Sequence, residues 1–296
     1  MKSDHGAAST SLLGNNPLAK SIVGTILIIV ISSVGAGLLA FEWGVRTAIF
    51  RGIRTCTTAA PPATEIKAAA PTPVEDSQVA RIRENLPMKV WMPRDERRMM
   101  ERVLTPDAVA LEWGSGGSTF FISTRVKTLY SVENAAAWCD EMEKEGGHAM
   151  RTLEKAGRLV YICSNRYTPT KRLGYPEDKP KEAVKAFRAP YIEAMDTIHT
   201  FRNVTNYDVV LLDGRYRLAC LLHTLKYTDT SSKLLLHDFE RFKSKIAKRL
   251  NNTFDIVEET SAKHQRMGWL RKKESASFDS EEVQNMYQKA VLSPGP

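Results

Sequence analysis

The sequence is poor in cysteine and lacks the paired cysteine spacings that hold structural metal ions. Its four cysteines stand at positions 56, 139, 163 and 220, and no two of them form a C-x-x-C pair. A zinc-binding module is therefore not expected. Cys163 and Cys220 fall in apolar segments, where a free cysteine usually fills the core as a small side chain. The cysteines alone neither require nor exclude an oxidising compartment.

The sequence also lacks internal repeats and any stretch in which basic residues alternate with aromatic ones. Nucleic acid is therefore not an expected partner, because single-strand binders combine the two kinds of side chain. The net charge is nevertheless +8. Two interpretations stay open for it: an ordinary solvated basic surface, or recognition of an acidic partner such as a phosphate, a uronate or an anionic lipid.

Charged residues are absent from residues 21–40, where Ile, Leu and Val dominate. That length suffices to cross a membrane as a helix, and Trp43 and Phe50 follow as an interfacial aromatic belt would. We therefore predict a polar tail over residues 1–20 and a transmembrane anchor over 21–45. A cleaved signal peptide is the alternative, but the apolar run is longer than the core of such a peptide. Basic residues flank both ends, so the orientation is not determined.

Residues 46–77 are rich in Ala, Pro and Thr and predict a stalk. A catalytic domain is expected over residues 78–273 and a loose polar tail over 274–296. Anchor, stalk and domain form the layout of many single-pass enzymes of the endoplasmic reticulum and Golgi, although a cytosolic orientation fits equally. The sequons at Asn203 and Asn251 would permit glycosylation of a lumenal domain.

The most informative stretch is Val109–Thr119, in which an apolar run ends at Glu112 and is followed by three glycines. This is the pattern of a buried strand, a tight turn and a helix start. Glycines are needed where the backbone takes positive φ or approaches a ligand, and the free N–H groups of a helix start bind anions. Glu133 ends the next apolar run, nineteen residues after Gly114. An acid at that place suits the hydroxyls of a ribose.

Apolar runs alternate with helical patterns through most of the domain. Strands are predicted at residues 109–113, 128–133, 159–163, 207–213, 233–237, 254–259 and 267–272. A helix is expected between neighbours in this list, except that a long insertion follows residue 163 and no helix separates the last two strands. Such alternation predicts an α/β fold with a mostly parallel sheet, and the final pair predicts an antiparallel hairpin at its edge.

These features together resemble class I S-adenosylmethionine-dependent methyltransferases, over residues 104–273. The resemblance rests on the acid-x-Gly-x-Gly-Gly turn at Glu112, on Tyr207–Gly214 and on Lys233–Asp238. A dinucleotide fingerprint would require Gly or Ala where Thr119 stands. More narrowly, the chain looks like a poorly characterised methyltransferase-like group. The resemblance implies a Rossmann-like sheet and S-adenosylmethionine as cofactor, bound by Glu112, Gly114, Ser115, Gly116, Gly117, Ser118, Glu133 and Ser164.

Within that set the resemblance implies that Glu112 and the glycine turn hold the methionine part, Glu133 the ribose and Ser164 the adenine. For Glu112 and Glu133 a purely structural role, bracing the turn or capping a helix, stays open.

The residues expected to act on the methyl acceptor are Asp213, His237 and Asp238, at the ends of two strands. They are candidates for removing a proton, and Asp213 with Asp238 could alternatively hold a divalent cation. A structural role for His237 also stays open. Tyr175 lies in a long insertion, residues 167–180, whose composition is typical of a lid, and Arg215 adds positive charge beside Asp213. Both are candidate substrate-binding residues.

Two functional hypotheses follow. The first is a membrane-anchored methyltransferase acting on an oxygen of a small molecule or glycan, with an acidic acceptor as one option. The second is an inactive methyltransferase fold that serves as a binding or scaffold module. The sequence specifies neither the acceptor nor the oligomeric state.

Overall fold

The computed structural model describes residues 73–295, apart from 165–167 and 262–265. The predicted N-terminal tail, the anchor at 21–45 and all but the last residues of the stalk lie outside this range. Within it, no helix is both long and apolar enough to cross a membrane.

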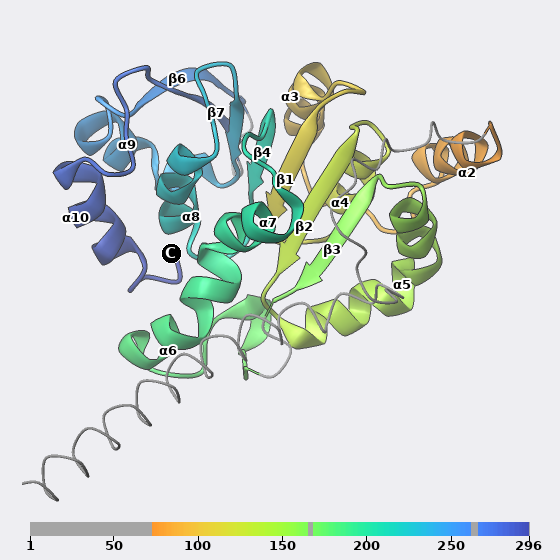
Figure 1. Cartoon of the computed structure of the whole chain (residues 1–296), viewed down its shortest axis with the longest axis horizontal. Coiled ribbons are helices and arrows are strands. Elements are labelled where there is room, and N and C mark those ends of the chain that lie inside the picture. The colour runs from red at the N-terminus through yellow and green to blue at the C-terminus, as the bar shows by residue number, and fades with distance from the viewer. Residues whose placement is uncertain (1–72, 165–167, 262–265, 296) are drawn as a thin grey trace, which may run out of the picture. The chain divides into compact units, whose positions relative to one another are not determined.

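A seven-stranded sheet forms the centre of the domain (Figure 1). Its order is β3-β2-β1-β4-β5-β7-β6, and the first five strands in this order pair in parallel. β7 joins β5 and β6 through antiparallel pairing. The predicted parallel sheet with an antiparallel edge hairpin is confirmed. The strands are β1 Val109–Trp113, β2 Thr128–Glu133, β3 Leu159–Cys163, β4 Val209–Leu212, β5 Lys233–Leu236, β6 Phe254–Glu259 and β7 Gly268–Lys272.

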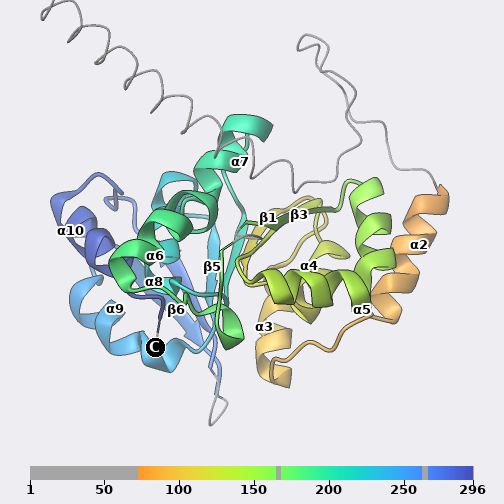
Figure 2. The same cartoon turned by 90° about the horizontal axis from the view of Figure 1, so that it is seen from below.

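Helices cover both faces of the sheet (Figure 2). One face carries α2 Pro73–Glu84, α3 Arg94–Val103, α4 Gly117–Ser123 and α5 Ala136–Lys155. The other carries α6 Pro180–Phe187, the π-helix η2 Arg188–Ile192, α7 Ala194–Arg202, α8 Arg217–His223, α9 Lys243–Arg249 and α10 Glu281–Ala290. Short 3-10 helices complete the fold: η1 Arg172–Gly174, η3 Thr224–Lys226 and η4 Phe239–Arg241.

Successive residues of a strand contribute to different cores, because side chains alternate across a sheet. Ala110 of β1 packs beneath α3 and α4, whereas Leu111 and Trp113 pack on the opposite side. Both cores are filled by large apolar side chains, so burial fixes the register of every central strand.

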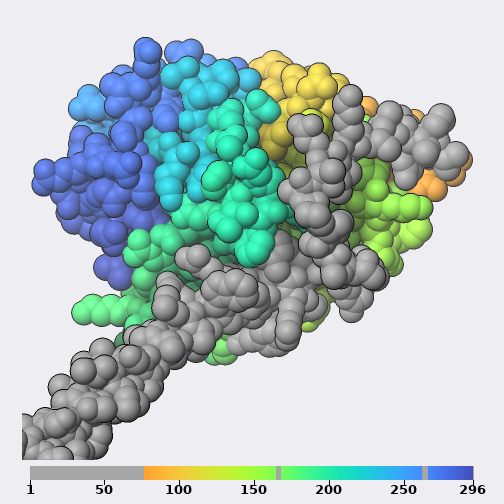
Figure 3. Space-filling view, in the orientation of Figure 1, coloured from red at the N-terminus to blue at the C-terminus, as the bar shows by residue number. Residues whose placement is uncertain are grey.

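The C-terminal segment is more ordered than its composition predicts. We expected a loose tail after residue 273, but residues 281–290 form α10, which packs on α8. Val283 and Tyr287 are buried, and the Tyr287 hydroxyl donates to Glu193 at 2.8 Å. In the space-filling view this segment (blue) forms one end of the described domain (Figure 3). The prediction failed because three apolar contacts suffice to bury a short amphipathic helix.

A disulfide joins Cys139, in the first turn of α5, to Cys163 at the end of β3. The expectation that Cys163 is a free core side chain is therefore wrong. The expectation holds for Cys220, which is free and buried. The two paired cysteines are 24 residues apart in sequence, and only the packing of α5 beside β3 brings them together.

Candidate functional site

The carboxyl ends of β1, β2 and β4 open into one cavity of about 740 Å³. In parallel α/β sheets ligands bind at this edge, where the strand order reverses. Four segments line it: the glycine turn, the start of α5, the insertion after β3 and the turn after β4. The lining residues are Gly114, Ser115, Glu133, Asn134, Ala135, Ala137, Trp138, Glu141, Thr170, Lys171, Arg172, Leu173, Gly174, Asp213, Gly214, Arg215 and Arg217.

The glycine turn after β1 depends on close backbone packing. Gly114 has φ of +90°, and a Cβ there would lie 2.6 Å from the backbone nitrogen of Gly214. Only glycine combines that conformation with that approach. Gly214 is constrained in turn, since a Cβ would lie 1.9 Å from the Tyr191 hydroxyl. The turns after β1 and β4 therefore form a joint floor for the cavity.

Glu133 lies at the cavity wall and ties the glycine turn to the start of α5. Its carboxylate accepts hydrogen bonds from the backbone nitrogens of Ser115, Asn134 and Ala135 at 2.8–3.0 Å, and from the Ser115 hydroxyl at 3.2 Å. Burial raises its pKa, and these bonds partly offset that effect. The position suits a ribose contact, and the bonds give Glu133 the bracing role as well.

Glu112 lies beneath the turn and does not line the cavity. Its side chain is fully buried and accepts hydrogen bonds from the hydroxyls of Ser118, Thr119 and Ser131. Burial raises its pKa to about 7, against the opposing effect of those three bonds. This geometry favours the structural alternative for Glu112, that of holding α4 against β1 and β2.

Of the remaining predicted cofactor residues, some line the cavity and others have structural contacts outside it. Ser115 lines the cavity, whereas Gly116, Gly117, Ser118 and Ser164 do not. Gly117 lies against the backbone of Lys89, where a Cβ would be 2.2 Å from the carbonyl oxygen. The Ser164 hydroxyl donates to the Glu133 carbonyl at 2.9 Å, which leaves Ser164 at the end of β3 as a link to β2.

Two cavity residues were missed by the sequence analysis. The Trp138 indole donates to the Ser115 carbonyl at 2.7 Å and stands partly exposed, offering an aromatic wall. Asn134 donates to the carbonyl of Gly174 at 2.8 Å, joining β2 to the insertion. Both follow Glu133 closely, so the end of the second strand was the signal that could have identified them.

On the other side of the cavity, Asp213 belongs to a buried chain of charges. His237 Nδ1 lies 2.8 Å from Asp213, and its Nε2 lies 3.4 Å from Glu96 of α3. Arg217 pairs with Asp213 at 3.1 Å and with Asp238 at 2.8 Å. Of the three predicted catalytic residues only Asp213 lines the cavity, and His237 and Asp238 stand behind it. Glu96 was missed because nothing marks it in the sequence of α3.

The pKa shifts follow from this arrangement. Burial alone would lower the pKa of His237, but Asp213 and Glu96 outweigh it and raise that pKa to about 10. Burial would raise the pKa of Asp213, but His237, Arg217 and Arg215 hold it below its usual value. At neutral pH the pair is therefore an imidazolium and a carboxylate. His237 does not have a free imidazole with which to accept a proton, whereas Asp213 is ionised and faces the cavity.

The residues present do not fit the divalent cation considered for Asp213 and Asp238. The Arg217 guanidinium already lies between the two carboxylates, and Arg241 lies 3.4 Å from Asp238. The part of the chain that the structure describes contains no group of three or more His, Cys, Asp and Glu side chains placed to hold a metal.

The insertion after β3 forms the outer wall of the cavity. Thr170 and Pro176 form an antiparallel bridge, and η1 lies between them. The guanidinium of Arg215 lies 4.4 Å from the ring centre of Tyr175, which links this wall to the turn after β4. These are the two predicted substrate-binding residues, and of the two only Arg215 lines the cavity. Residues 168–179 of the predicted lid contain the short helix η1, and α6 begins at Pro180, where that lid was predicted to end.

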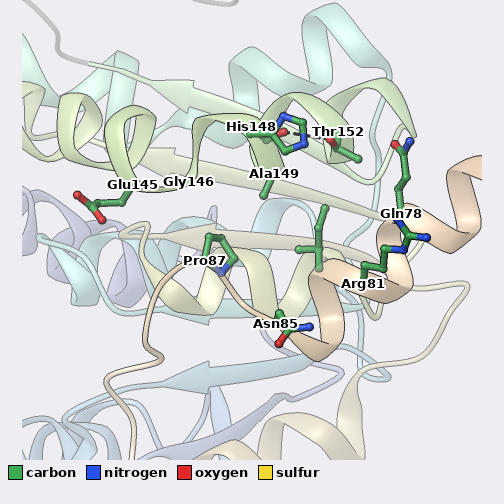
Figure 4. Close-up of a pocket in the computed structure, with 10 residues that line it drawn as sticks. Gln78, Arg81, Asn85, Pro87, Glu145, Gly146, His148, Ala149 and Thr152 are labelled. Atoms are coloured by element: carbon green, nitrogen blue, oxygen red, sulfur yellow. Dashed lines mark hydrogen bonds between the residues drawn. The ribbon is translucent and has the colours of Figure 1, made fainter.

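A second hollow, of about 510 Å³, lies between α2 and α5. Figure 4 shows Gln78 and Arg81 of α2, with Asn85 just after that helix, across from His148 and Thr152 of α5. None of the predicted site residues lines it, so the chemistry predicted from the sequence belongs to the cavity at the strand ends.

No protein-family model matches this chain, and no curated protein matches it. Among solved structures, it is similar to a methyltransferase-like protein (spo2022) from Silicibacter pomeroyi, with 19% identity and a TM-score of 0.52 over 70% of this chain and 98% of that one. A ribosomal protein L11 methylase from Lactobacillus delbrueckii gives 9% identity and a TM-score of 0.38, over 60% of this chain and 77% of that one. The first likeness shows that this chain has the class I methyltransferase fold, as its sequence motifs predicted.

Proposed function

We propose that this chain is an S-adenosylmethionine-dependent methyltransferase, held at a membrane by residues 21–45 and acting on an oxygen of a small molecule or glycan. The observation that carries the proposal is the single cavity in which the Gly114 turn, Glu133 and Asp213 meet. A scaffold module with no ligand would not require a polar cavity at this edge of the sheet.

The cofactor would occupy the half of the cavity between the glycine turn and α5. Glu133 would accept from the ribose hydroxyls, and the Trp138 ring would cover the nucleoside. Ser115 connects the two, because it donates to Glu133 and accepts from Trp138. When bound, the cofactor supplies an electrophilic methyl group on a sulfonium centre.

The other half of the cavity would position the acceptor hydroxyl and remove its proton. In this half Asp213 would accept the proton that the acceptor hydroxyl gives up on methylation. Arg217 and His237 keep Asp213 ionised before the reaction. Because a carboxylate with a lowered pKa is a weak base, most of the rate would come from positioning the two reactants.

Besides Arg217, which is paired with Asp213, three basic side chains line the cavity: Lys171 and Arg172 from the insertion, and Arg215 from the turn after β4. No ion pair of these three residues occurs within the described ranges. Unpaired cations in a cavity favour a negatively charged ligand. This supports an acceptor that carries a carboxylate, sulfate or phosphate near the methylated hydroxyl.

A lumenal location in the endoplasmic reticulum or Golgi is part of the proposal. The Cys139–Cys163 disulfide supports it, because disulfides persist in oxidising compartments and are rare in the cytosol. Together with an uncleaved anchor at residues 21–45, this gives a single-pass protein whose domain faces the lumen.

Titration calorimetry on the full-length chain in neutral detergent tests the cofactor assignment. We expect binding of S-adenosylmethionine and of its demethylated product, and no binding of NAD. Trp138→Ala should weaken cofactor binding by about tenfold, since loss of an aromatic stack costs about 1–1.5 kcal/mol. Trp91→Ala, at an exposed tryptophan away from the cavity, is the matched control. Absence of cofactor binding by the wild type would refute the proposal.

Transfer of a labelled methyl group to a panel of hydroxyl acceptors separates the enzyme from the scaffold alternative. The panel should pair each neutral sugar or phenol with its carboxylated counterpart. Turnover of a carboxylated member supports the proposal in full. Cofactor binding without turnover of any member would favour the scaffold.

A further inference from the structure

A third concave surface, distinct from the cofactor cavity and from the hollow between α2 and α5, is rich in basic residues. It has a volume of about 680 Å³ and runs between the segment after α2, helix α3 and helix α4. Five basic residues line it, Lys89, Arg94, Arg97, Arg98 and Arg125, against one acid, Glu101. We call this surface the basic groove. It shares no lining residue with the cofactor cavity.

The cations of the groove are not neutralised by the acids beside them in sequence. Asp95 accepts from the backbone nitrogens of Glu96 and Ser261, and the Glu96 side chain is buried against His237. The first two acids of helix α3 therefore point away from the groove, whereas its first three arginines line it. In the described part of the chain, Lys89, Arg94, Arg97 and Arg98 form no ion pair.

The floor of the groove concentrates this charge further. The Arg125 guanidinium stacks on Phe121, 3.8 Å from the ring centre, and donates to the Phe121 carbonyl at 2.9 Å. Burial and the nearby Arg83 lower the pKa of Arg125. Holding several like charges together is unfavourable unless an anion shares them, so the groove is built to receive one.

The flank of the groove favours a sugar polymer. Trp91 is 74% exposed at its edge, and Lys89 lies 4.2 Å from the centre of that indole ring. An exposed indole gives a flat apolar surface on which a sugar ring can lie. A bilayer surface is flat and would not fill a hollow, and its anionic leaflet faces the cytoplasm. The disulfide argues for a compartment without nucleic acid.

We propose that the basic groove binds a chain of an acidic polysaccharide, through its carboxylate or sulfate groups. The attachment would hold a polymer at the domain whether or not that polymer is the methyl acceptor. This binding goes beyond the proposed function, and cofactor binding and methyl transfer are measured separately from it. Failure of one therefore does not imply failure of the other.

Binding of defined polymers to the full-length chain in neutral detergent tests the inference. The probes are polygalacturonate for carboxylates, dextran sulfate for sulfates and dextran as the neutral polymer. Single-stranded oligothymidylate and short-chain phosphatidylserine represent the other two classes of anion. The test variant is Arg94→Ser/Arg98→Ser, at two exposed arginines of the groove. The matched control is Lys245→Ser/Lys248→Ser on α9, which removes the same charge from two exposed residues elsewhere.

We expect the wild type to bind at least one acidic polysaccharide and not dextran. The groove variant should bind it about tenfold more weakly, because two charge-assisted contacts are lost, while the control stays within about twofold. Equal thermal melting of both variants shows that the fold is intact. If polysaccharide binding weakens equally in both variants, it depends on net charge alone, and the assignment of binding to the basic groove is overturned. Absence of polysaccharide binding, or tighter groove-dependent binding of the oligonucleotide or the lipid, would overturn it as well.

Discussion

At the scale of single residues, three acids at strand ends have three different surroundings. Glu112 is enclosed by hydroxyl groups, Glu133 by backbone N–H groups, and Asp213 by cations. Donors that stabilise a negative charge differ in strength, and a cation stabilises it most. Burial raises the pKa of all three acids, and the donors at Glu112 and Glu133 offset it only in part, so the pKa of each is raised. At Asp213 the neighbouring cations outweigh burial, and its pKa is lowered.

Glu112→Gln should change how stability depends on pH. The folded state raises the pKa of Glu112 from 4.5 to about 7 and so binds its proton more tightly than the unfolded chain does. The stabilisation from this proton is complete below pH 4.5 and lost as pH rises through 7. Between these two pH values the free energy of unfolding of the wild type should fall by up to about 3 kcal/mol relative to that of the glutamine variant. Urea unfolding of both proteins at acid and neutral pH measures it, and identical pH dependence would contradict it.

Asp213→Asn should abolish methyl transfer while leaving cofactor affinity unchanged. The substitution removes the ionised oxygen that faces the acceptor and the closest partner of His237. The pKa of His237 should fall below its value of about 10, toward the neutral range. Imidazole NMR signals followed from pH 6 to 9 report this shift, and labelled methyl transfer reports turnover.

Asp238→Asn is the comparison variant, because Asp238 does not line the cavity and is linked to Asp213 through Arg217 and His237. It should reduce turnover less than Asp213→Asn does. Full turnover by the Asp213 variant would assign proton removal to another group.

At the scale of elements, the strands were predictable and several other features were not. The bounds of β1, β2, β3 and β6 match the prediction, because each is an apolar or β-branched run closed by a polar residue or a turn. The helices at 180–202 and α10 were missed, since their short apolar stripes become visible only against a partner such as α8. For the same reason the sequence predicted that Asp213, His237 and Asp238 lie near one another, but not that Arg217 and Glu96 join them.

Removal of the Cys139–Cys163 disulfide tests how strongly α5 is held to the sheet. It ties α5, which carries Trp138 and Glu141 into the cavity, to the end of β3. Cys139→Ser should lower the free energy of unfolding by about 3 kcal/mol through the freed chain segment. It should also weaken cofactor binding, because the cavity wall formed by α5 loses its attachment.

The prediction is checked by measuring the melting temperatures of the wild type and of Cys139→Ser with and without reductant. Reductant should lower the melting temperature of the wild type toward that of the variant and leave the variant unchanged. A non-reducing peptide map should show residues 139 and 163 in one linked pair of peptides. Two free thiols at these positions in protein from its native membrane would contradict the pairing.

At the scale of the whole molecule, the basic residues in excess of the acidic ones are not spread evenly over the surface. Some of the basic residues line the cavity at the strand ends, and others form the basic groove. Many remaining cations are paired, as Arg102 is with Glu258 and Lys243 with Glu259. The net charge of +8 therefore argues for acidic ligands more strongly than its value alone does, because unpaired cations gather in two hollows.

The orientation of the whole chain can be tested through glycosylation. Both sequon asparagines, Asn203 and Asn251, are exposed, but Thr253 of the second sequon is buried whereas Thr205 of the first is exposed. Asn203 also ends α7 in a left-handed conformation with φ of +53°. If the domain faces the lumen, Asn203 is therefore the better glycan acceptor in the folded chain.

We expect the protein in the membrane pellet after an alkaline carbonate wash, with a glycan that an endoglycosidase removes. Asn203→Gln should lose that mass shift and Asn251→Gln should keep it. An unglycosylated chain whose Cys139 and Cys163 are free thiols would place the domain in the cytosol, and release of the chain by carbonate would remove the anchor.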